Sequence, residues 1–396
     1  MTKRIGILTG GGDAPGLNPA IKYIVKKASQ VGYETFGITD GWKGLLEPGI
    51  EKITDLGSDL QKRLEVSAME LIKNRIHEFE WKDLVKNARL SIAPLSKSDV
   101  SKWGKKPGTN LGSSRTNPFA KGNDRSKILI ENIEKLGLDY IVALGGEDTQ
   151  TVGYRLSDLG KNVIGIPKTI DGDLPGTDYT LGFRTAVGVI KKNVEIADGT
   201  ARSHNQTTVV ETMGRHSGLL AYEGAHSTNV GMVLIPEYSP SLEEIKTILM
   251  RRKEQGVSYD IILVSEGTKI RDYEDRSSAA KGDEFGHVKF DHVGQLLASD
   301  LEDLTDQKIR SISLGHLLRG ADPNGYDIDM ANHFGVAAVE LIEKGISGRM
   351  ISYSDGKITH VPLSRAIEEI KTVNVEKMYN ISGLNFITSS TVLLIL

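Results

Sequence analysis

Short glycine clusters stand directly after runs of apolar and β-branched residues, and this pairing limits the folds open to the chain more than any other feature. Glycines at 10–12 follow the apolar run 5–8, and glycines at 145–146 follow the run 140–144. The run 163–166 ends in a similar way at Pro167. Runs this short and this apolar are typical of strands buried on both faces of a parallel sheet.

Amphipathic segments separate these runs, at residues 19–31, 126–136 and 149–159. Strand, glycine turn and helix in alternation predict an α/β fold in which a mainly parallel, doubly wound sheet is flanked by helices. Such sheets bind ligands beyond the carboxyl ends of their strands, where the glycine clusters would lie. Further runs at 207–210, 232–235 and 261–264 predict a second α/β lobe, which a length of 396 residues accommodates.

Residues 50–108 break this pattern. The stretch 60–79 is charged and helix-prone, and 94–107 is rich in Lys and Ser. We expect a solvated helical insertion, and the alternative is a lid or a contact between subunits.

Charge and cysteine content exclude several classes of protein. Lys and Arg number 49 against 52 for Asp and Glu, a net charge of -3, so no general basic field points to nucleic acid or to a membrane surface. The absence of cysteine removes disulfides, thiolate zinc sites and cysteine nucleophiles, and it fits a reducing compartment. The apolar run at 5–8 is too short for the core of a signal peptide. We therefore expect a cytoplasmic protein.

The first glycine cluster, Gly-Gly-Gly-Asp-Ala-Pro-Gly at 10–16, follows a predicted strand and opens a predicted helix. Backbone N–H groups in such a turn, together with the helix N-terminus, favour a bound phosphate. The cluster lacks the G-x-G-x-x-G pattern of a Rossmann dehydrogenase and the Gly-Lys-Ser/Thr ending of a Walker loop. A phosphate site and a tight structural turn both remain open.

The second cluster, 145–149, carries two adjacent acids, Glu147 and Asp148. Acids beside a phosphate repel it unless a cation lies between them, so the pattern predicts Mg²⁺. The alternative is that one acid caps the following helix.

The densest cluster is Pro-Lys-Thr-Ile-Asp-Gly-Asp at 167–173. In an extended segment, Asp171 and Asp173 would face the same way. One carboxylate could then accept a proton from a substrate hydroxyl while the other holds a metal ion. Arginines at 115, 215, 310 and 319 are candidates for binding phosphate oxygens bidentately.

The order of these clusters resembles the phosphofructokinases from residue 4 to about residue 350. The matching motifs are Gly-Gly-Asp-Ala-Pro-Gly-Leu-Asn at 11–18, Leu-Gly-Ser-Ser-Arg at 111–115, Gly-Thr-Asp-Tyr-Thr-Leu-Gly-Phe at 176–183, Val-Glu-Thr-Met-Gly-Arg at 210–215 and Leu-Gly-His-Leu-Leu-Arg-Gly at 314–320. The resemblance implies a phosphoryl-donor lobe of residues 1–182 plus 318–368, containing the insertion 50–108. It implies a sugar-phosphate lobe of residues 183–317 plus 369–396.

The resemblance also implies roles for single residues. Asp171 matches the general base that deprotonates the sugar's 1-hydroxyl, Thr169 lies beside the transferred phosphoryl group, and Arg215 stabilises the transferred charge. Glu147 and Asp173 match metal positions. The donor positions are Gly11, Gly12, Arg115, Asp148 and Lys168, and the last two are also expected among the catalytic residues with Asp171, Thr169 and Arg215. Besides Thr169, Asp171 and Arg215, the acceptor positions are Met213, Gly214, Glu266, Arg310, His316 and Arg319.

Two positions indicate the phosphoryl donor. ATP-using members have glycine where this chain has Asp148 and Lys168. A carboxylate at 148 would oppose the α-phosphate of a nucleotide by volume and by charge, and Lys168 would supply a cation to pyrophosphate. The chain therefore resembles the pyrophosphate-dependent branch, and the absence of an aromatic residue at Thr116 agrees.

Three positions depart from the family pattern. Glu147 stands where Asp is usual, and Ile328 replaces a usual arginine. Gln206 replaces an arginine that, in the family, reaches the 6-phosphate of a neighbouring subunit's substrate. This exchange leaves the acceptor sugar open.

The sequence thus predicts a Mg²⁺-dependent enzyme that moves phosphate from pyrophosphate to the 1-hydroxyl of fructose 6-phosphate. The alternatives are ATP as donor, another acceptor such as sedoheptulose 7-phosphate, or a catalytically silent sugar-phosphate sensor. Small molecules are the expected partners, with neither nucleic acid nor membrane, in a homo-oligomer that is a dimer or a tetramer.

Overall fold

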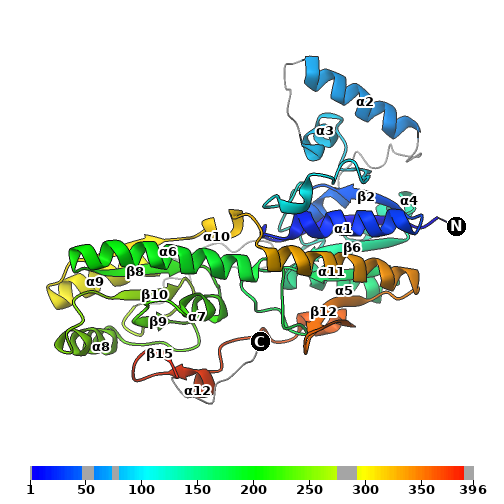
Figure 1. The fold of residues 1–396 in the computed structure, drawn as a ribbon. Helices are drawn as coiled ribbons and strands as arrows, with labels where there is room; N and C mark the ends of the chain where they lie inside the picture. Colours follow the sequence, from blue (N-terminus) through cyan, green and yellow to red (C-terminus); the bar gives the residue numbers. More distant parts are fainter. Residues whose placement is uncertain (1, 47–57, 74–79, 274–291, 388–396) are drawn as a thin grey trace.

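The computed structural model describes residues 2–46, 58–73, 80–273 and 292–387, and these form two lobes placed side by side (Figure 1). The first lobe is built on a seven-stranded sheet and the second on a four-stranded sheet. The predicted α/β architecture with mainly parallel sheets is confirmed.

The sheet of the first lobe has the order β13-β12-β7-β6-β1-β2-β3. Its strands are β1 (Arg4–Thr9), β2 (Glu34–Ile38), β3 (Ile92–Pro94), β6 (Tyr140–Gly145), β7 (Val163–Pro167), β12 (Arg349–Ser354) and β13 (Lys357–Pro362). Strands β12, β7, β6, β1 and β2 run parallel, and only the edge strands β3 and β13 are antiparallel. Every residue of β6 and β7 is buried, as the unbroken apolar runs predict.

Crossover connections leave the centre of this sheet in opposite directions. Helix α1 (Leu17–Gln30) joins β1 to β2 on one side, and α5 (Glu147–Asp158) joins β6 to β7 on the other. Because such crossovers are right-handed, α1 and α5 cover opposite faces of the sheet. The strand order therefore reverses between β1 and β6, and a ligand is expected beyond the carboxyl ends of these two strands.

The remaining helical segments of the first lobe, apart from α2, pack around this framework. They are η1 (Gly41–Leu45), α2 (Ser58–Lys73), α3 (Trp81–Asn87), η3 (Trp103–Lys105), α4 (Ser126–Lys135), α11 (Gly325–Glu343) and η5 (Leu363–Ile367). Helix α11 packs along α1. A small hairpin is formed by β4 (Phe119–Ala120) and β5 (Asn123–Asp124).

The second lobe has a fully parallel sheet in the order β11-β8-β10-β9. Its elements are α6 (Phe183–His204), β8 (Thr207–Thr212), α7 (Leu219–Ala225), β9 (Met232–Leu234), α8 (Leu242–Glu254), β10 (Ile261–Ser265), α9 (Val293–Thr305), β11 (Ile309–Ser313) and α10 (Leu317–Gly320). The segments α12 (Val375–Met378), β14 (Tyr379–Asn380) and β15 (Asn385–Phe386) lie beside β9, where Tyr379 Oη donates to Val233 O at 2.6 Å.

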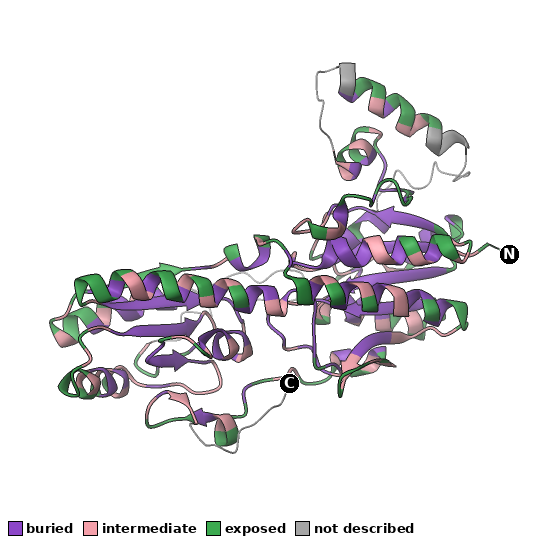
Figure 2. Ribbon diagram, in the orientation of Figure 1, coloured by how far each residue is buried: buried purple, intermediate pink, exposed green. Residues whose placement is uncertain are grey.

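Two hydrophobic cores correspond to the two sheets, and Figure 2 shows the strands buried between helices whose outer faces are exposed. The first core is centred on β1, β6 and β7 with α1 and α11 over them, and the second on β8, β9 and β10. Ala14 and Ile170 belong to loops that leave the first sheet, yet both pack into the second core. The loops that follow β1 and β7 are therefore held by both lobes. Within the described residues, no helix is long and apolar enough to cross a bilayer.

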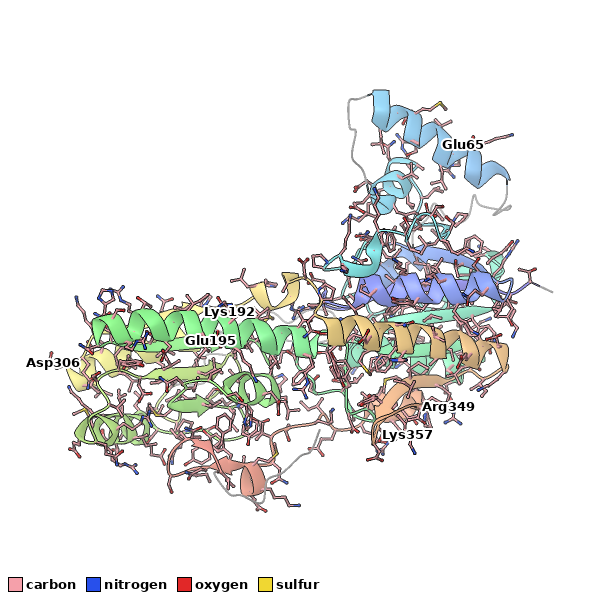
Figure 3. The ribbon with its side chains drawn as sticks, viewed as in Figure 1. Glu65, Lys192, Glu195, Asp306, Arg349 and Lys357 are labelled. Atoms are coloured by element: carbon pink, nitrogen blue, oxygen red, sulfur yellow. The ribbon has the colours of Figure 1, made fainter. Side chains whose placement is uncertain are left out.

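The segment 50–108 requires a correction. Part of it is a helical excursion, since α2 stands off the first lobe and carries the exposed Glu65 (Figure 3). Residues 90–103 are only partly solvated, because β3 pairs with β2 and the side chains of Leu90, Ile92 and Trp103 are buried in the first core. Residues 96–99 and 101–102 of the same stretch are exposed. Alternating Lys and Ser residues in this stretch concealed its apolar positions. Residues 50–57 and 74–79 lie outside the described part of the chain.

Candidate active site

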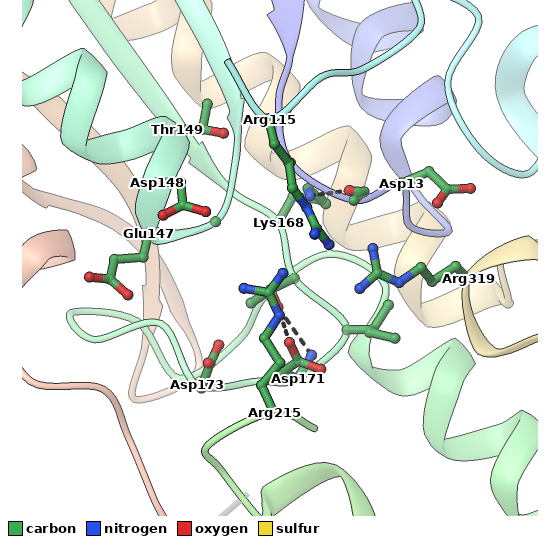
Figure 4. Close-up of a pocket in the computed structure, with 15 residues that line it drawn as sticks. Asp13, Arg115, Glu147, Asp148, Thr149, Lys168, Asp171, Asp173, Arg215 and Arg319 are labelled. Carbon is green, nitrogen blue, oxygen red and sulfur yellow. Dashed lines mark hydrogen bonds between the residues drawn. The ribbon is translucent and has the colours of Figure 1, made fainter. Parts of the chain in front are cut away.

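The loops that follow β1, β6 and β7 meet loops of the second lobe in one cleft (Figure 4). Its lining is Gly11, Gly12, Asp13, Arg115, Gly146, Glu147, Asp148, Thr149, Lys168, Thr169, Ile170, Asp171, Asp173, Arg215 and Arg319. The cleft lies beyond the carboxyl ends of β1 and β6, where the strand order reverses. All donor and metal positions expected from the sequence are therefore brought together.

The first glycine turn is shaped by close approach of other groups. A Cβ on Gly12 would lie 1.3 Å from Arg319 Nη1, and one on Gly10 would lie 2.4 Å from Thr149 Oγ1. Gly11 adopts a left-handed φ of 78°, which glycine tolerates best. Its N–H group donates to Ser114 O at 3.0 Å, so this donor is already used within the protein. The turn is thus a close-packed floor of the cleft as well as a candidate phosphate cradle.

Lys168 connects the loops of the first lobe. Its backbone N–H donates to Gly145 O at 3.1 Å, and its buried ammonium donates to Gly12 O. Burial, and next the neighbouring Arg319 guanidinium, lower the pKa of Lys168 to about 7. A cation that is costly to keep charged in the free protein would be stabilised by an anion in the cleft.

Asp171 occupies the centre of the cleft and is almost fully buried. Its backbone N–H donates to Thr169 Oγ1 at 3.1 Å, and its Oδ2 accepts from the same hydroxyl at 3.3 Å. Its Oδ1 is buried without a hydrogen-bond partner among the described residues. An unsatisfied carboxylate oxygen facing a cleft is ready to accept a hydrogen bond from a substrate hydroxyl.

Asp173 lines the same cleft, as the spacing predicts. Burial, and then the charge of Asp171, raise the pKa of Asp173 to about 7. Glu147 and Asp148 enter the cleft from the first turn of α5, which Gly146 precedes as the capping residue. Three carboxylates therefore face one another around the donor end of the cleft.

These carboxylates fit a divalent cation. No group of three acids or histidines in the described residues is arranged to hold a metal alone. Mg²⁺ normally binds through one or two carboxylates and completes its shell with substrate phosphates and water. Glu147 and Asp173 suit this mode, and a dication would relieve the repulsion that raises the pKa of Asp173.

Two arginines reach the cleft from the second lobe, Arg215 from the loop after β8 and Arg319 from α10. Arg215 has a left-handed φ of 50°, and its N–H donates to Glu266 Oε1 at 3.3 Å. Arg319, on α10, is buried, and its Nε donates to Met213 Sδ at 3.4 Å. A Cβ on Gly267 would lie 1.6 Å from Arg215 O, so the strained backbone of Arg215 is fixed by close packing.

The other expected acceptor residues divide into two groups. Met213, Gly214 and Glu266 adjoin the two arginines, and His316 lines a hollow that joins the cleft. Arg310 does not reach the cleft of its own chain. It is exposed and its Nε donates to Gln206 Oε1 at 2.9 Å.

The position of Arg310 follows from strand register. It lies opposite Thr208, near the amino ends of β8 and β11, whereas the cleft lies at the carboxyl ends. At about 3.3 Å per residue, the five residues from Thr208 to Met213 place it about 16 Å along the strand from the cleft. Sequence motifs alone do not give this register.

One buried residue that positions the cleft was missed by sequence reasoning. Asp327 is fully buried at the first turn of α11, and burial raises its pKa. Its carboxylate accepts from Tyr179 Oη at 2.5 Å, Gly182 N at 2.7 Å, and Thr185 N and Oγ1 at 2.8 and 2.5 Å. Thr180, in the same loop, donates through its Oγ1 to Thr169 O at 2.7 Å. The only sequence signal was a charged residue within the otherwise apolar face of a helix.

Comparison with known proteins identifies what this chain resembles. The family model described as phosphofructokinase matches residues 4–342. A protein from Dictyoglomus thermophilum named pyrophosphate–fructose 6-phosphate 1-phosphotransferase is 37% identical over 377 residues, covering 95% of this chain and 96% of that protein. A protein from Chloroflexus aurantiacus named ATP-dependent 6-phosphofructokinase is 34% identical over 372 residues, covering 94% of this chain and 93% of its own.

A solved structure shares the fold. The crystal structure of a pyrophosphate-dependent phosphofructokinase from Nitrosospira multiformis superimposes with a TM-score of 0.75 at 22% identity, covering 97% of this chain and 89% of that one.

Proposed function

The chain belongs to the phosphofructokinase family, and from this premise we propose that it transfers a phosphoryl group from pyrophosphate to the 1-hydroxyl of fructose 6-phosphate, giving fructose 1,6-bisphosphate. The observation that best supports pyrophosphate as the donor is that Asp148 and Lys168 both line the cleft. Relatives with either donor in their names are about equally similar to the chain, so identity alone does not choose between donors.

Asp148 and Lys168 favour a short donor for different reasons. Asp148 places a carboxylate at the mouth of the cleft, where the α-phosphate and the nucleoside of ATP would have to pass. Lys168 supplies a buried cation whose charge is restored by a nearby anion. Pyrophosphate, which ends after two phosphates, would contact the ammonium of Lys168 and would not extend as far as the carboxylate of Asp148.

Chemistry at the acceptor would be carried by Asp171. Its Oδ1 would accept the proton of the 1-hydroxyl as that oxygen attacks the terminal phosphorus of the donor, while the bridging P–O bond of pyrophosphate breaks and orthophosphate leaves. Thr169 holds this carboxylate from its other oxygen, and Arg215 and Arg319 face the charge that develops on the transferred group. Mg²⁺, held by Glu147 and Asp173, would neutralise charge on the donor oxygens.

Assembly would complete the acceptor end. Arg310 points away from its own cleft and lies beside Gln206, whose position in the family reaches into a neighbouring subunit. We therefore expect a homo-oligomer in which Arg310 contacts the substrate of the adjacent copy. The cytoplasm, where sugar phosphates are plentiful, would be its location.

The decisive experiment is a matrix of donors and acceptors with purified protein. Pyrophosphate and ATP are each paired with fructose 6-phosphate and with sedoheptulose 7-phosphate, and turnover is followed with Mg²⁺ and without it. We expect activity with pyrophosphate and Mg²⁺ and little with ATP. Faster turnover with ATP would reject the donor assignment.

Two variants of Asp148, and a third that also lacks Lys168, separate the effects of charge and volume on the choice of donor. Asp148→Asn removes the charge and keeps the volume, and Asp148→Gly removes both, alone or with Lys168→Gly. ATP use should rise modestly in the first and more in the second, while pyrophosphate use falls when Lys168 is lost. If neither variant changes the donor preference, Asp148 does not determine it.

A further inference from the structure

A second hollow adjoins the catalytic cleft on the side of the first glycine turn. It has a volume of about 550 Å³, within the range of small-molecule sites. Gly11, Gly12, Asp13, Arg115 and Arg319 line both spaces, so the two lie side by side. The hollow is completed by Lys82, Pro107, Gly108, Thr109, Asn110, Ser113 and His316.

Positive charge predominates in this lining. Lys82, Arg115 and Arg319 are cationic, and Asp13 is the one carboxylate among the lining residues. His316 adds an imidazole ring, whose N–H group can donate a hydrogen bond to an anion. A hollow with these groups, beside a phosphotransfer cleft, is suited to a phosphate dianion.

Lys82 is the unexpected member, because it comes from the inserted segment. It is half-buried on α3, and among the described residues it makes no hydrogen bond and no ion pair. The neighbouring Lys86 and Lys106 are instead paired, with Asp40 at 3.0 Å and with Glu80 at 2.5 Å. Lys82 is therefore a cation available to a ligand.

The residues before Lys82 fix its position against the first lobe. Glu80 accepts from Asn110 Nδ2 at 3.0 Å as well as from Lys106. The buried Trp81 donates from Nε1 to Pro94 O at 3.2 Å and fills the space above Gly37, where a Cβ would lie 2.6 Å from its ring. The turn before helix α3 is thus hydrogen-bonded and packed against the first lobe. These contacts of Glu80 and Trp81 place Lys82 in the wall of the hollow.

We propose that Lys82 is a binding residue for the phosphate at the far end of the acceptor sugar, with His316 and Arg319 beside it. The proposal rests on the proposed function, since it assigns the second hollow to the acceptor of the same reaction. Arg319 reaches both spaces, so a sugar with its 1-hydroxyl at Asp171 would extend past Arg319 toward Lys82. Lys82 would then supply, within one chain, a charge that Gln206 does not bring.

The test measures Michaelis constants for both substrates in Lys82→Ala, Lys82→Arg and the control Lys102→Ala. Lys102 is exposed, lines neither space and removes the same charge from the same lobe. We expect Lys82→Ala to raise the constant for fructose 6-phosphate about ten- to a hundredfold, as for one lost charge-assisted bond. The constant for pyrophosphate should change less than about twofold, and Lys82→Arg should recover most of the loss.

Three results would overturn the proposal. An unchanged constant for fructose 6-phosphate removes Lys82 from the acceptor site. A raised constant for pyrophosphate would make the hollow an extension of the donor site. A change confined to the sigmoidicity of the rate curve would make it a site for a free phosphorylated effector.

The donor assignment is kept separate by repeating the acceptor titrations with ATP. If neither donor supports turnover, calorimetric binding of fructose 6-phosphate and of sedoheptulose 7-phosphate to wild type and Lys82→Ala replaces the kinetics. Weaker binding in the variant then supports the proposal while the proposed function fails. A wild type that binds neither sugar phosphate overturns both.

Discussion

Gly12→Ala tests whether the guanidinium of Arg319 must lie directly over the first glycine turn. A Cβ at residue 12 would stand 1.3 Å from Arg319 Nη1 and 2.5 Å from its Cζ, which no contact distance allows. The backbone at Gly12 does not have a positive φ, so alanine fits the main chain. Only the end of the arginine side chain must move, and the adjoining hollow gives it room.

The expected cost is therefore that of losing Arg319 from the reacting centre. One charge-assisted hydrogen bond to a phosphate contributes about 1.5–3 kcal/mol, which corresponds to about a ten- to 150-fold fall in kcat/KM. The fold should persist, and Gly188→Ala serves as the control because no atom lies within 4 Å of a Cβ there.

The assay is a double-mutant cycle on kcat/KM with Gly12→Ala, Arg319→Ala and the pair. If the alanine acts through Arg319, the pair should be no worse than Arg319→Ala alone, within about 0.5 kcal/mol. Costs that add would refute the reasoning, because they would mean that the methyl group obstructs the donor itself.

The other predictions concern the base, the buried lysine and the acceptor. Asp171→Asn should keep the fold and substrate binding while lowering kcat by about two to four decades, and near-normal turnover would remove Asp171 as the base. The pKa of Lys168 is lowered to about 7 in the free protein, so the residue is charged below this pH and neutral above it, and pyrophosphate affinity should fall as pH rises through about 7. Lys168→Arg stays charged and should remove this dependence, and an identical pH profile in both proteins would contradict the assignment. Gln206→Arg should lower the Michaelis constant for fructose 6-phosphate about tenfold in the Lys82→Ala protein, and less where Lys82 already supplies the charge. No gain, together with a micromolar constant in the wild type, would mean that another cation already compensates for Gln206.

The sequence was sufficient for features that depend on local pattern. Short apolar runs ending in glycine, or in Pro167 for β7, located β1, β6 and β7 to within a residue or two, and the clusters after them lie in one cleft. This works because carboxyl ends of parallel strands meet at one edge, so residues distant in the chain are brought together by the fold class alone.

Features set by strand register and long-range packing were not accessible. Nothing in the sequence around Arg310 shows that it lies at the end of β11 farther from the cleft. Strand β3 is too short and too mixed in composition to be recognised. The half-burial of Lys82 in a cationic hollow depends on Trp81 packing over β2, a contact across more than forty residues. Asp327 was missed because a charged residue on the apolar face of a helix does not by itself show which groups its carboxylate would bind.

The four bonds accepted by Asp327 join parts of the molecule that belong to different lobes. Three of them fasten the first turn of α11 to the start of α6, and the fourth comes from Tyr179 in the loop before α6. In Figure 1 these two helices extend in opposite directions, one along each lobe. Asp327 would therefore be the pivot of a rotation between the lobes, with α6, of 22 residues, as its lever arm. That arm is about 33 Å long at 1.5 Å per residue, so a turn of about 5° at the pivot would carry its far end about 3 Å. Thr169 and Asp171, next to the pivot, would hardly move, whereas Gln206 and Arg310 at the end of the arm would sweep across whatever surface they face.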